Sequence, residues 1–278
     1  MLDILKAAAY GLIQGLTEFL PVSSSGHLAI SANIFGLEFE DAILFTLILH
    51  LGSLIAVFMI YRKDILELFV GFVVLAVKIF TGRFKYNKTS PGERFVIMIF
   101  LASLPLVIGA LIEGGVESLS ENTKLIGAFL MINSVILFCS DRIPTGKLTE
   151  RTASPKNALF VGACQLIAVV PGISRSGSTI TGGLLSGFDR KFAVKFSFIM
   201  SIPAILGASV FKIAGFASSE SAANFDFVTF MMCFAGFICA LISGLAAIYV
   251  INIIARKKRF VVFAIYCFTA GLLTLIFG

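Results

Sequence analysis

The stretch "QGLTEFLPVSSSGH", residues 14 to 27, decides how the rest of this chain is interpreted. It places a carboxylate, three consecutive serines and one of the two histidines inside a sequence that is otherwise close to lipid in character. Of the 278 residues, 58% are hydrophobic and 14% are charged, and the mean hydropathy is +0.99. A water-soluble domain of this size does not keep such a balance in solution. The composition predicts an integral membrane protein, in which a polar stretch of this kind calls for a structural or functional explanation.

Apolar runs of about 20 residues fit the hydrocarbon core of a bilayer, and the sequence contains six good candidates. We expect them to be helical, because a helix satisfies its backbone groups within the segment when that segment faces lipid. The predicted fold class is therefore an all-α integral membrane protein with six transmembrane helices. The predicted spans are residues 42–60, 95–112, 125–140, 193–211, 227–254 and 260–277.

Two further features of the sequence argue against processing and against metal-thiolate chemistry. The first apolar stretch, residues 4–20, contains charged side chains and lacks the short positive start and cleavage site of a secretory signal, so we expect it to be retained. The five cysteines fall in apolar segments without a CxxC or His-rich spacing. We therefore expect small buried residues there, and neither a disulfide framework nor a thiolate site.

The net charge of +6 is distributed unevenly, which indicates orientation in a membrane and argues against nucleic acid as the partner. By the positive-inside rule, the basic clusters are cytoplasmic and the acidic loops face out. The basic clusters share one side only if residues 65–80 do not cross, and this segment is short enough to lie in the interface or to dip in and return. The basic clusters are Arg62 and Lys63; Arg83, Lys85, Lys88 and Arg94; Arg142, Lys147, Arg151 and Lys156; Arg190, Lys191 and Lys195; and Arg256, Lys257, Lys258 and Arg259. The acidic residues are Glu38, Glu40 and Asp41; Glu113, Glu117 and Glu121; and Glu220 and Asp226.

An internal repeat relates the two halves of the chain. Sliding the sequence by 151 positions aligns Gln14 with Gln165, Ser23 with Ser174, and "FTLILHLGSLIA" with "FSFIMSIPAILG". Chance identity in Ser- and Gly-rich sequence is the alternative. The charge pattern puts the two leading segments on opposite sides, so the repeats are inverted, an arrangement that places sites at the bilayer midplane. The prediction is a single membrane domain with two internal repeats, over residues 1–278, about 1–140 and about 158–278.

Each repeat contains an apolar run, a proline, a serine-rich turn and a second apolar run that is too short to cross. We predict two re-entrant helical hairpins, each broken at a polar turn that protein or water must cover. A serine in each turn caps the helix that follows, and helix N-termini attract anions. Ordinary capping is the alternative for either turn alone, whereas two turns that face each other favour an anion site. The candidate caps are Ser23, Ser24 and Ser25, and Ser174, Ser176 and Ser178.

Gln14 and Glu18 lie one helical turn apart and therefore share a face. An ionisable group at membrane depth is costly and is by default a functional hypothesis. A carboxylate and an anion-attracting turn repel the same phosphate unless a cation stands between them. We therefore expect Glu18 and Gln14 to supply oxygen ligands to a divalent cation, Mg²⁺ or Ca²⁺. The alternative is a structural partner for Glu18, such as a neighbouring basic group.

Three other side chains are candidates for chemistry. Arg175 is the only basic residue in "PGISRSGSTITGG" and has the fork that matches phosphate oxygens; a snorkelling interfacial arginine is the alternative. His27 follows the serine turn and suits a base, an acid or a nucleophile near neutral pH. His50 lies in an apolar span with no partner visible, and we interpret it as structural. The set as a whole suits phosphoryl transfer to or from a lipid phosphate or diphosphate.

The two motifs, "QGLTEFLPVSSSGH" and "PGISRSGSTITGG", resemble those of the bacterial undecaprenyl-diphosphatase family, also known as the bacitracin-resistance type. The resemblance covers essentially the whole chain. It implies a phosphatase that converts undecaprenyl diphosphate to undecaprenyl phosphate and inorganic phosphate with the help of a divalent cation. This activity recycles the lipid carrier for peptidoglycan synthesis and confers bacitracin resistance. The resemblance also implies a multi-pass protein of the bacterial cell (inner) membrane with an outward-facing active site and a tendency to form homodimers.

The resemblance assigns roles residue by residue. Its E/Q-x-x-x-E pattern falls on Gln14 and Glu18, and Gln14 is the neutral choice where other members carry glutamate, which leaves one anionic ligand fewer. Its P-G-x-S-R-S-G pattern places Arg175 at the centre. We expect Ser24 to be the nucleophile with His27 as its base; a phospho-His27 intermediate and metal-bound water are alternatives that stay open. The predicted site residues are Glu18, Ser24, His27 and Arg175 for catalysis; Ser23, Ser25, Gly26, Ser174, Ser176, Gly177 and Thr179 for substrate binding; and Glu18 and Gln14 for the metal.

The rival hypothesis is a transporter or flippase of the undecaprenyl phosphate carrier. Inverted repeats, broken helices and a midplane anion site are typical of secondary transporters. A pure transporter needs no activated nucleophile, so "SSSGH" beside Glu18 favours the enzyme.

Overall fold

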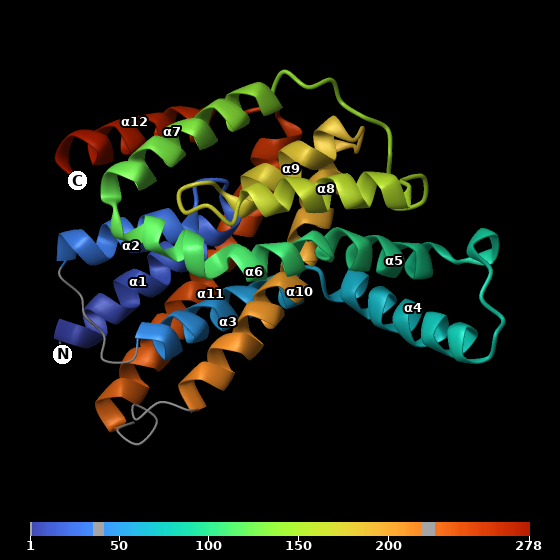
Figure 1. The fold of residues 1–278 in the computed structure, drawn as a ribbon, viewed down its shortest axis with the longest axis horizontal. Helices are drawn as coiled ribbons and strands as arrows, with labels where there is room; N and C mark the ends of the chain where they lie inside the picture. Colours follow the sequence, from blue (N-terminus) through green and yellow to red (C-terminus); the bar gives the residue numbers. More distant parts are fainter. Residues whose placement is uncertain (1, 36–41, 218–225) are drawn as a thin grey trace.

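The computed structural model describes residues 2–35, 42–217 and 226–278, and these ranges are helical with connecting turns (Figure 1). An isolated bridge between Leu148 and Phe188 is the only β-type pairing within them. The all-α prediction is confirmed. The α-helices are α1 (Leu2–Phe19), α2 (Ser24–Phe35), α3 (Ala42–Ile60), α4 (Arg62–Phe80), α5 (Pro91–Ser103), α6 (Pro105–Glu117), α7 (Thr123–Ser140), α8 (Pro155–Ile167), α9 (Arg175–Leu185), α10 (Arg190–Ala217), α11 (Phe227–Arg256) and α12 (Val261–Phe277), and the short 3-10 helices are η1 (Tyr86–Lys88) and η2 (Ser118–Glu121).

The first serine-rich stretch separates α1 from α2. Pro21 lies in the turn, and its ring prevents a backbone N–H bond at that position. Ser23 has a φ of 73°, a left-handed conformation that is uncommon outside glycine. Its hydroxyl accepts a hydrogen bond from the backbone N–H of Gly26 at 3.4 Å, so Ser23 caps α2.

The second serine-rich stretch separates α8 from α9 in a similar way. Gly172 follows a proline and takes a φ of 95°, which glycine adopts without steric cost. Ser174 is the N-cap of α9 and accepts a hydrogen bond from the N–H of Gly177 at 3.1 Å. The two stretches that match in the sequence thus form two helix breaks with serine caps.

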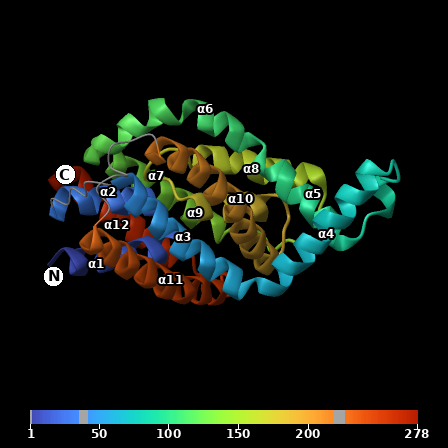
Figure 2. The ribbon, with the colours of Figure 1, turned by 90° about the horizontal axis from the view of Figure 1, so that it is seen from below.

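Close backbone contacts bring the long helices together in two pairs, α1 with α11 and α7 with α12 (Figures 1 and 2). A Cβ at Gly11 of α1 would lie 2.1 Å from the carbonyl oxygen of Gly236 of α11. A Cβ at Gly127 of α7 would lie 2.7 Å from the carbonyl oxygen of Gly271 of α12. Because only hydrogen fits at these positions, the glycines set the helix separations.

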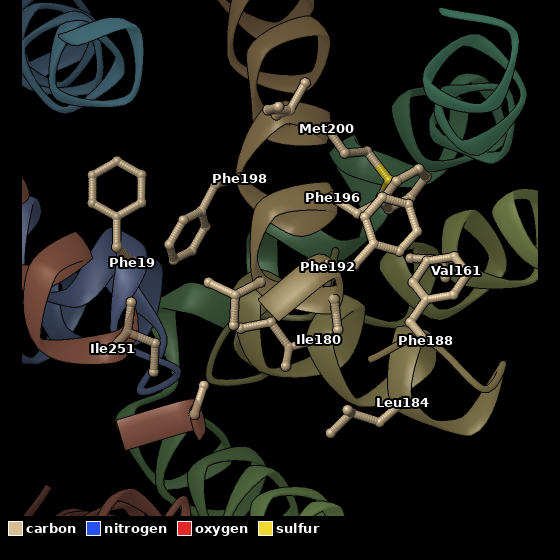
Figure 3. Close-up of a cluster of buried hydrophobic side chains, with 14 of the residues drawn as sticks. Phe19, Val161, Ile180, Leu184, Phe188, Phe192, Phe196, Phe198, Met200 and Ile251 are labelled. Atoms are coloured by element: carbon tan, nitrogen blue, oxygen red, sulfur yellow. The ribbon is translucent and has the colours of Figure 1, made fainter. Parts of the chain in front are cut away.

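The main hydrophobic core is built around α10 (Figure 3). Phe192 and Phe196 lie one turn apart on α10 with ring centroids 5.7 Å apart, and Phe188 lies 4.6 Å from Phe192. Elsewhere on α10, Phe198 meets Phe19 edge to face at 5.3 Å. Phe19 is the last residue of α1, so this contact anchors the end of the helix that carries the first motif.

Several helices have the length and apolar character of membrane spans. Four segments of the described chain pass on both counts, which fits the prediction of a membrane protein with several apolar helices. α3 and α4 pass only as a pair that is bent by 89°, and α12 is apolar with 17 residues. α4 contains the predicted segment 65–80 and begins at Arg62. The four segments are Pro91–Ile112, Thr123–Ser140, Arg190–Val210 and Phe227–Arg256.

The two termini lie at one end of the molecule, and the connection between α4 and α5 lies at the other (Figures 1 and 2). Arg190 and Lys195 of one basic cluster form ion pairs with acidic residues next to two other basic clusters. Arg190 lies 3.5 Å from Asp141, and Lys195 lies 2.9 Å from Asp64 and also pairs with Glu150. These contacts place the start of α10 beside the end of α7 and the start of α4. Of the acidic residues predicted to face out, Glu38, Glu40, Asp41 and Glu220 lie outside the described residues.

Candidate active site

The two motifs meet through an ion pair between Glu18 and Arg175. Nη2 of Arg175 donates to Oε1 of Glu18 at 2.5 Å. Oε2 of Glu18 accepts hydrogen bonds from Nε2 of Gln14 at 3.0 Å and from the hydroxyl of Ser24 at 2.8 Å. Both charged side chains are largely buried, with 6% of Glu18 and 18% of Arg175 exposed. Glu18 therefore has the basic neighbour that we gave as an alternative, and this neighbour comes from the second motif.

A cavity of about 260 Å³ opens beside this pair. Its polar part consists of Glu18, Arg175, the turn Ser23–Ser24–Ser25, His50 and Ser209, and the rest is apolar, including Ile173 and residues of α10. One side of the cavity is therefore lined by charged and hydroxyl-bearing side chains, and the other side is mainly apolar. Such a combination suits a ligand with an ionic head and a hydrocarbon tail.

Two helix N-termini begin at the cavity. α2 starts at Ser24 and α9 starts at Arg175, and both residues line the cavity. Each start carries unpaired N–H groups and a partial positive charge, so the pair of helices favours an anion between them. Arg175 adds a full positive charge and also has an Nη1 with no hydrogen-bond partner among the described residues.

Asn133 of α7 joins the two helix breaks, and the sequence analysis missed it. Its Nδ2 donates to the carbonyl oxygen of Pro21 at 2.9 Å, and its Oδ1 accepts from the N–H of Ser174 at 3.2 Å. The side chain is fully buried. One signal was available: an asparagine within an apolar span is costly unless its amide is hydrogen-bonded, so it predicts a polar partner.

His27 does not lie beside Ser24 as predicted. Its Nδ1 donates to the carbonyl oxygen of Ser23 at 2.8 Å, and its Nε2 lies 2.8 Å from the hydroxyl of Tyr266 on α12. The rings of His27 and Tyr266 stack with centroids 5.6 Å apart. The structure thus turns His27 away from the cavity, and the hydroxyl of Ser24 donates to Glu18 instead. The ring of His27 does not reach Ser24 because its partner on α12, Tyr266, fixes the ring in another direction.

Most residues predicted to bind substrate lie away from the cavity in this structure and form hydrogen bonds within the protein. Ser23 and Ser25 lie on the cavity, whereas the others are not among its lining residues. Ser176 donates to the carbonyl of Leu20 at 3.3 Å, and Thr179 lies 2.6 Å from the hydroxyl of Ser197. The residues predicted to bind substrate that lie off the cavity are Gly26, Ser174, Ser176, Gly177 and Thr179.

His50, which we interpreted as structural, lies on the cavity wall. It belongs to α3, and its Nε2 lies 3.9 Å from Oε2 of Glu18. Sequence reasoning had the means to find it, because the argument applied to Glu18, that a polar group at membrane depth needs a purpose, applies equally to a histidine there.

The oxygen donors near Glu18 fit a hard divalent cation. Oε1 of Gln14 is buried and has no hydrogen-bond partner among the described residues, and Glu18 and Ser24 add a carboxylate and a hydroxyl. Mg²⁺ and Ca²⁺ prefer such ligands.

Within the described ranges, no cluster of three or more His, Cys, Asp or Glu side chains gathers at one point, and the five cysteines are free. Cys233 and Cys267 are buried as expected, whereas Cys164 and Cys239 are only partly buried and Cys139 is exposed.

Comparisons with known proteins find one family and close relatives that match along the chain. A family described as "Bacitracin resistance protein BacA" matches residues 7–273. An undecaprenyl-diphosphatase of Methanobrevibacter smithii is 41% identical over 275 residues, which cover 98% of this chain and 96% of the relative. An undecaprenyl-diphosphatase of Methanosphaera stadtmanae is 37% identical over 280 residues, with 99% and 98% covered. One of Alkaliphilus metalliredigens is 38% identical over 275 residues, with 98% of both chains covered.

Proposed function

The chain belongs to the bacitracin resistance protein BacA family, and we propose that the cavity beside Glu18 and Arg175 is the active site of an undecaprenyl-diphosphatase. The enzyme hydrolyses undecaprenyl diphosphate to undecaprenyl phosphate and inorganic phosphate. The product is the lipid carrier of cell-wall synthesis, and its formation accounts for bacitracin resistance. The observation that carries the proposal is the contact of Glu18 with Arg175, which joins the two motifs inside one cavity.

Six spans and two re-entrant hairpins account for the three short helices beside the two breaks. α8 and α9 have 13 and 11 residues and α2 has 12. At about 1.5 Å per residue, each of these is well short of a hydrocarbon core of about 30 Å. The spans of the proposal are α3, the continuous pair α5 and α6, α7, α10, α11 and α12. α4, bent away from α3 with Phe69, Phe72 and Phe80 exposed, lies in the interface. Homodimer formation, which the resemblance implies, stays a prediction.

The cavity opens toward the outer side of a bacterial inner membrane in this proposal. Its walls come from the first half of α3, including Leu47 and His50, and from the last part of α10, from Ala204 to Ser209. The opposite end of α10 carries Arg190 and Lys195, which the positive-inside rule assigns to the cytoplasm. The diphosphate therefore enters at the outer half of the membrane, and its C55 tail remains among lipid and the apolar wall.

Substrate recognition rests on fixed positive charge. The guanidinium of Arg175 and the N–H groups at the starts of α2 and α9 surround the place where the phosphates bind. These donors are positioned before the substrate arrives, so they stabilise the charge that develops in the transition state without reorganising. Glu18 holds the guanidinium in place through Oε1.

The attacking group of the proposal is the hydroxyl of Ser24. It already donates to Oε2 of Glu18 at 2.8 Å, so the carboxylate is placed to receive its proton. A bond forms from Oγ of Ser24 to the terminal phosphorus, and the bond from that phosphorus to the bridging oxygen breaks, with its electron pair staying on that oxygen. Glu18 passes the proton of Ser24 to the bridging oxygen as undecaprenyl phosphate leaves, so the carboxylate is regenerated for the second step. Glu18 takes over the role of base that the sequence analysis gave to His27.

Gln14 and Glu18, with hydroxyl oxygens of the serine turn, are the residues that would hold a divalent cation. When bound there, such an ion would neutralise phosphate charge and polarise the phosphorus–oxygen bonds. The free Oε1 of Gln14 supports this assignment, since a buried amide oxygen otherwise lacks a partner among the described residues.

Phosphate release from purified protein tests the proposed function. The protein in detergent is given undecaprenyl diphosphate, once with Mg²⁺ and once with an excess of chelator, and inorganic phosphate is measured over time. We expect steady release with Mg²⁺ and a strong decrease with chelator. A folded protein that releases no phosphate with Mg²⁺ or Ca²⁺ present would overturn the proposal.

A further inference from the structure

The mechanism above uses neither His50 nor Ser209 among the polar side chains of the cavity, and His50 is the one of the two that lies beside Glu18. Its Nδ1 lies 2.8 Å from the carbonyl oxygen of Thr46, four residues earlier on α3. A carbonyl oxygen only accepts hydrogen bonds, so Nδ1 carries a hydrogen and the neutral ring presents Nε2 as an acceptor. The backbone of α3 therefore fixes both the tautomer and the direction of the ring.

The position of His50 is also held firmly by the packing of α3 against α11. A Cβ at Gly52 would lie 2.6 Å from the carbonyl oxygen of Phe237 of α11, so the two backbones are in close contact there. Ser53 is fully buried and donates to the carbonyl oxygen of His50 at 2.9 Å. Rigid support of this kind is what a precisely placed functional side chain requires.

Nε2 of His50 and Oε2 of Glu18 face each other across 3.9 Å. This distance is too long for a direct hydrogen bond, and two acceptors have no hydrogen to share. A water molecule with its oxygen about 2.8 Å from each atom is able to donate one hydrogen to Nε2 and its other hydrogen to Oε2. His50 is 27% exposed, so solvent reaches this place from the cavity.

We propose that His50 is a positioning residue that, together with Glu18, holds and orients the water molecule consumed by the reaction. The inference rests on the proposed function, because hydrolysis of a diphosphate consumes one water whichever atom attacks first. The fixed tautomer suits an acceptor of a hydrogen bond from water.

The hydrolytic step forms one bond to phosphorus and breaks another. The oxygen of the water forms a bond to the phosphorus, and the bond from that phosphorus to the leaving oxygen breaks, with the electron pair staying on that oxygen. One proton of the water passes to Oε2 of Glu18 and from there to the leaving oxygen, which is Oγ of Ser24 when a phosphoserine has formed. Nε2 of His50 accepts a hydrogen bond from the other hydrogen and undergoes no net change.

The test compares His50→Ala and His50→Gln with a control on the same helix, Ile55→Ala, whose side chain is 40% exposed away from the cavity. The kcat and KM for undecaprenyl diphosphate are measured with each variant. We expect His50→Ala to lower kcat at least about tenfold with little change in KM, because substrate binding does not use His50. His50→Gln should restore much of the rate, since its amide oxygen accepts from water, and Ile55→Ala should match the wild type.

A second readout separates water positioning from a merely structural effect. With methanol present, the ratio of methyl phosphate to inorganic phosphate reports how well the site holds water. We expect this ratio to rise several-fold in His50→Ala and to return toward the wild-type value in His50→Gln. A His50→Ala variant with kcat within about twofold of wild type, or an unchanged product ratio, would overturn the role of His50. A wild type that releases no phosphate would instead overturn the proposed function.

Discussion

Arg175 and Glu18, 157 positions apart in the sequence, form a largely buried, hydrogen-bonded ion pair of 2.5 Å. The first residue of α9 thereby contacts the penultimate residue of α1. Two charges buried together are retained only where the geometry is good, because the loss of water around each ion is costly. In this protein both residues line the cavity, and the pair holds the guanidinium at the proposed phosphate site.

Two replacements of Arg175 should separate the effect of its positive charge on the reaction rate from the effect of its planar guanidinium. Arg175→Ala removes the fixed donor, and we expect kcat/KM for undecaprenyl diphosphate to fall by about 10²–10³ or more, as for other preorganised donors. Arg175→Lys keeps the charge without the planar fork and should give an intermediate rate. Steady-state kinetics in detergent measures both. Equal rates for Arg175→Lys and wild type would show that the fork has no part in the reaction.

Asn133 should be a major contributor to stability because it joins the two helix breaks. Asn133→Leu leaves the carbonyl of Pro21 and the N–H of Ser174 without their partner, at a cost of roughly 1–3 kcal/mol for each buried group. Thermal unfolding in detergent should show a clear decrease in Tm. The matched control is Ser134→Ala on the next residue, whose hydroxyl donates only to the carbonyl of Met131 in its own helix. A similar Tm for both variants would contradict the bridging role of Asn133.

His27 and Tyr266 should act as one unit. The tyrosine hydroxyl lies 2.8 Å from Nε2 of His27, and the same ring holds the carbonyl of Ser23. We therefore expect His27→Ala and Tyr266→Phe each to lower activity by disturbing the serine turn, and the double variant to be no worse than His27→Ala alone. Rates for the three variants form a double-mutant cycle. Strictly additive effects would mean that His27 acts independently of Tyr266.

Gly15 should tolerate no side chain. A Cβ there would lie 2.1 Å from the hydroxyl of Ser243 and 2.2 Å from the carbonyl of Ala240, so Gly15→Ala pushes α1 away from α11. We expect a loss of about 1–3 kcal/mol in the free energy of unfolding, as for other overpacked sites. Gly207→Ala is the control, because a Cβ at Gly207 meets no atom within 4 Å and should stabilise α10 by up to about 1 kcal/mol. A lower Tm for Gly207→Ala than for Gly15→Ala would contradict the packing argument.

The general plan of the fold was predictable because its causes are local. Proline and serine at the two matching stretches mark the helix breaks, and the apolar runs mark the long helices. The family, confirmed by the relatives, was identified from the same two stretches. The sequence analysis expected the two motifs to form one site, whereas it gave a basic partner of Glu18 only as an alternative and did not name Arg175 as that partner.

The details that the sequence did not predict depend on partners far along the chain. The ring of His27 is directed by Tyr266, 239 residues away, and no local pattern announces that contact. Asn133 and His50 each lie alone in an apolar run, and their importance appears only when α7 and α3 are placed beside the helix breaks. A short-range pattern fixes where helices begin and end, whereas the direction of a side chain depends on the neighbours that tertiary packing supplies.

Phosphate release by Glu18→Gln is the most direct test of the central claim that this cavity is where the diphosphate is hydrolysed. The variant keeps the size of the side chain but removes the charge that pairs with Arg175 and receives the proton of Ser24. Glu67→Gln on α4, outside the cavity, is the matched control. With undecaprenyl diphosphate and Mg²⁺, we predict an initial rate at least about 10²-fold lower for Glu18→Gln and a normal rate for Glu67→Gln. A Glu18→Gln rate within about twofold of wild type would contradict the account.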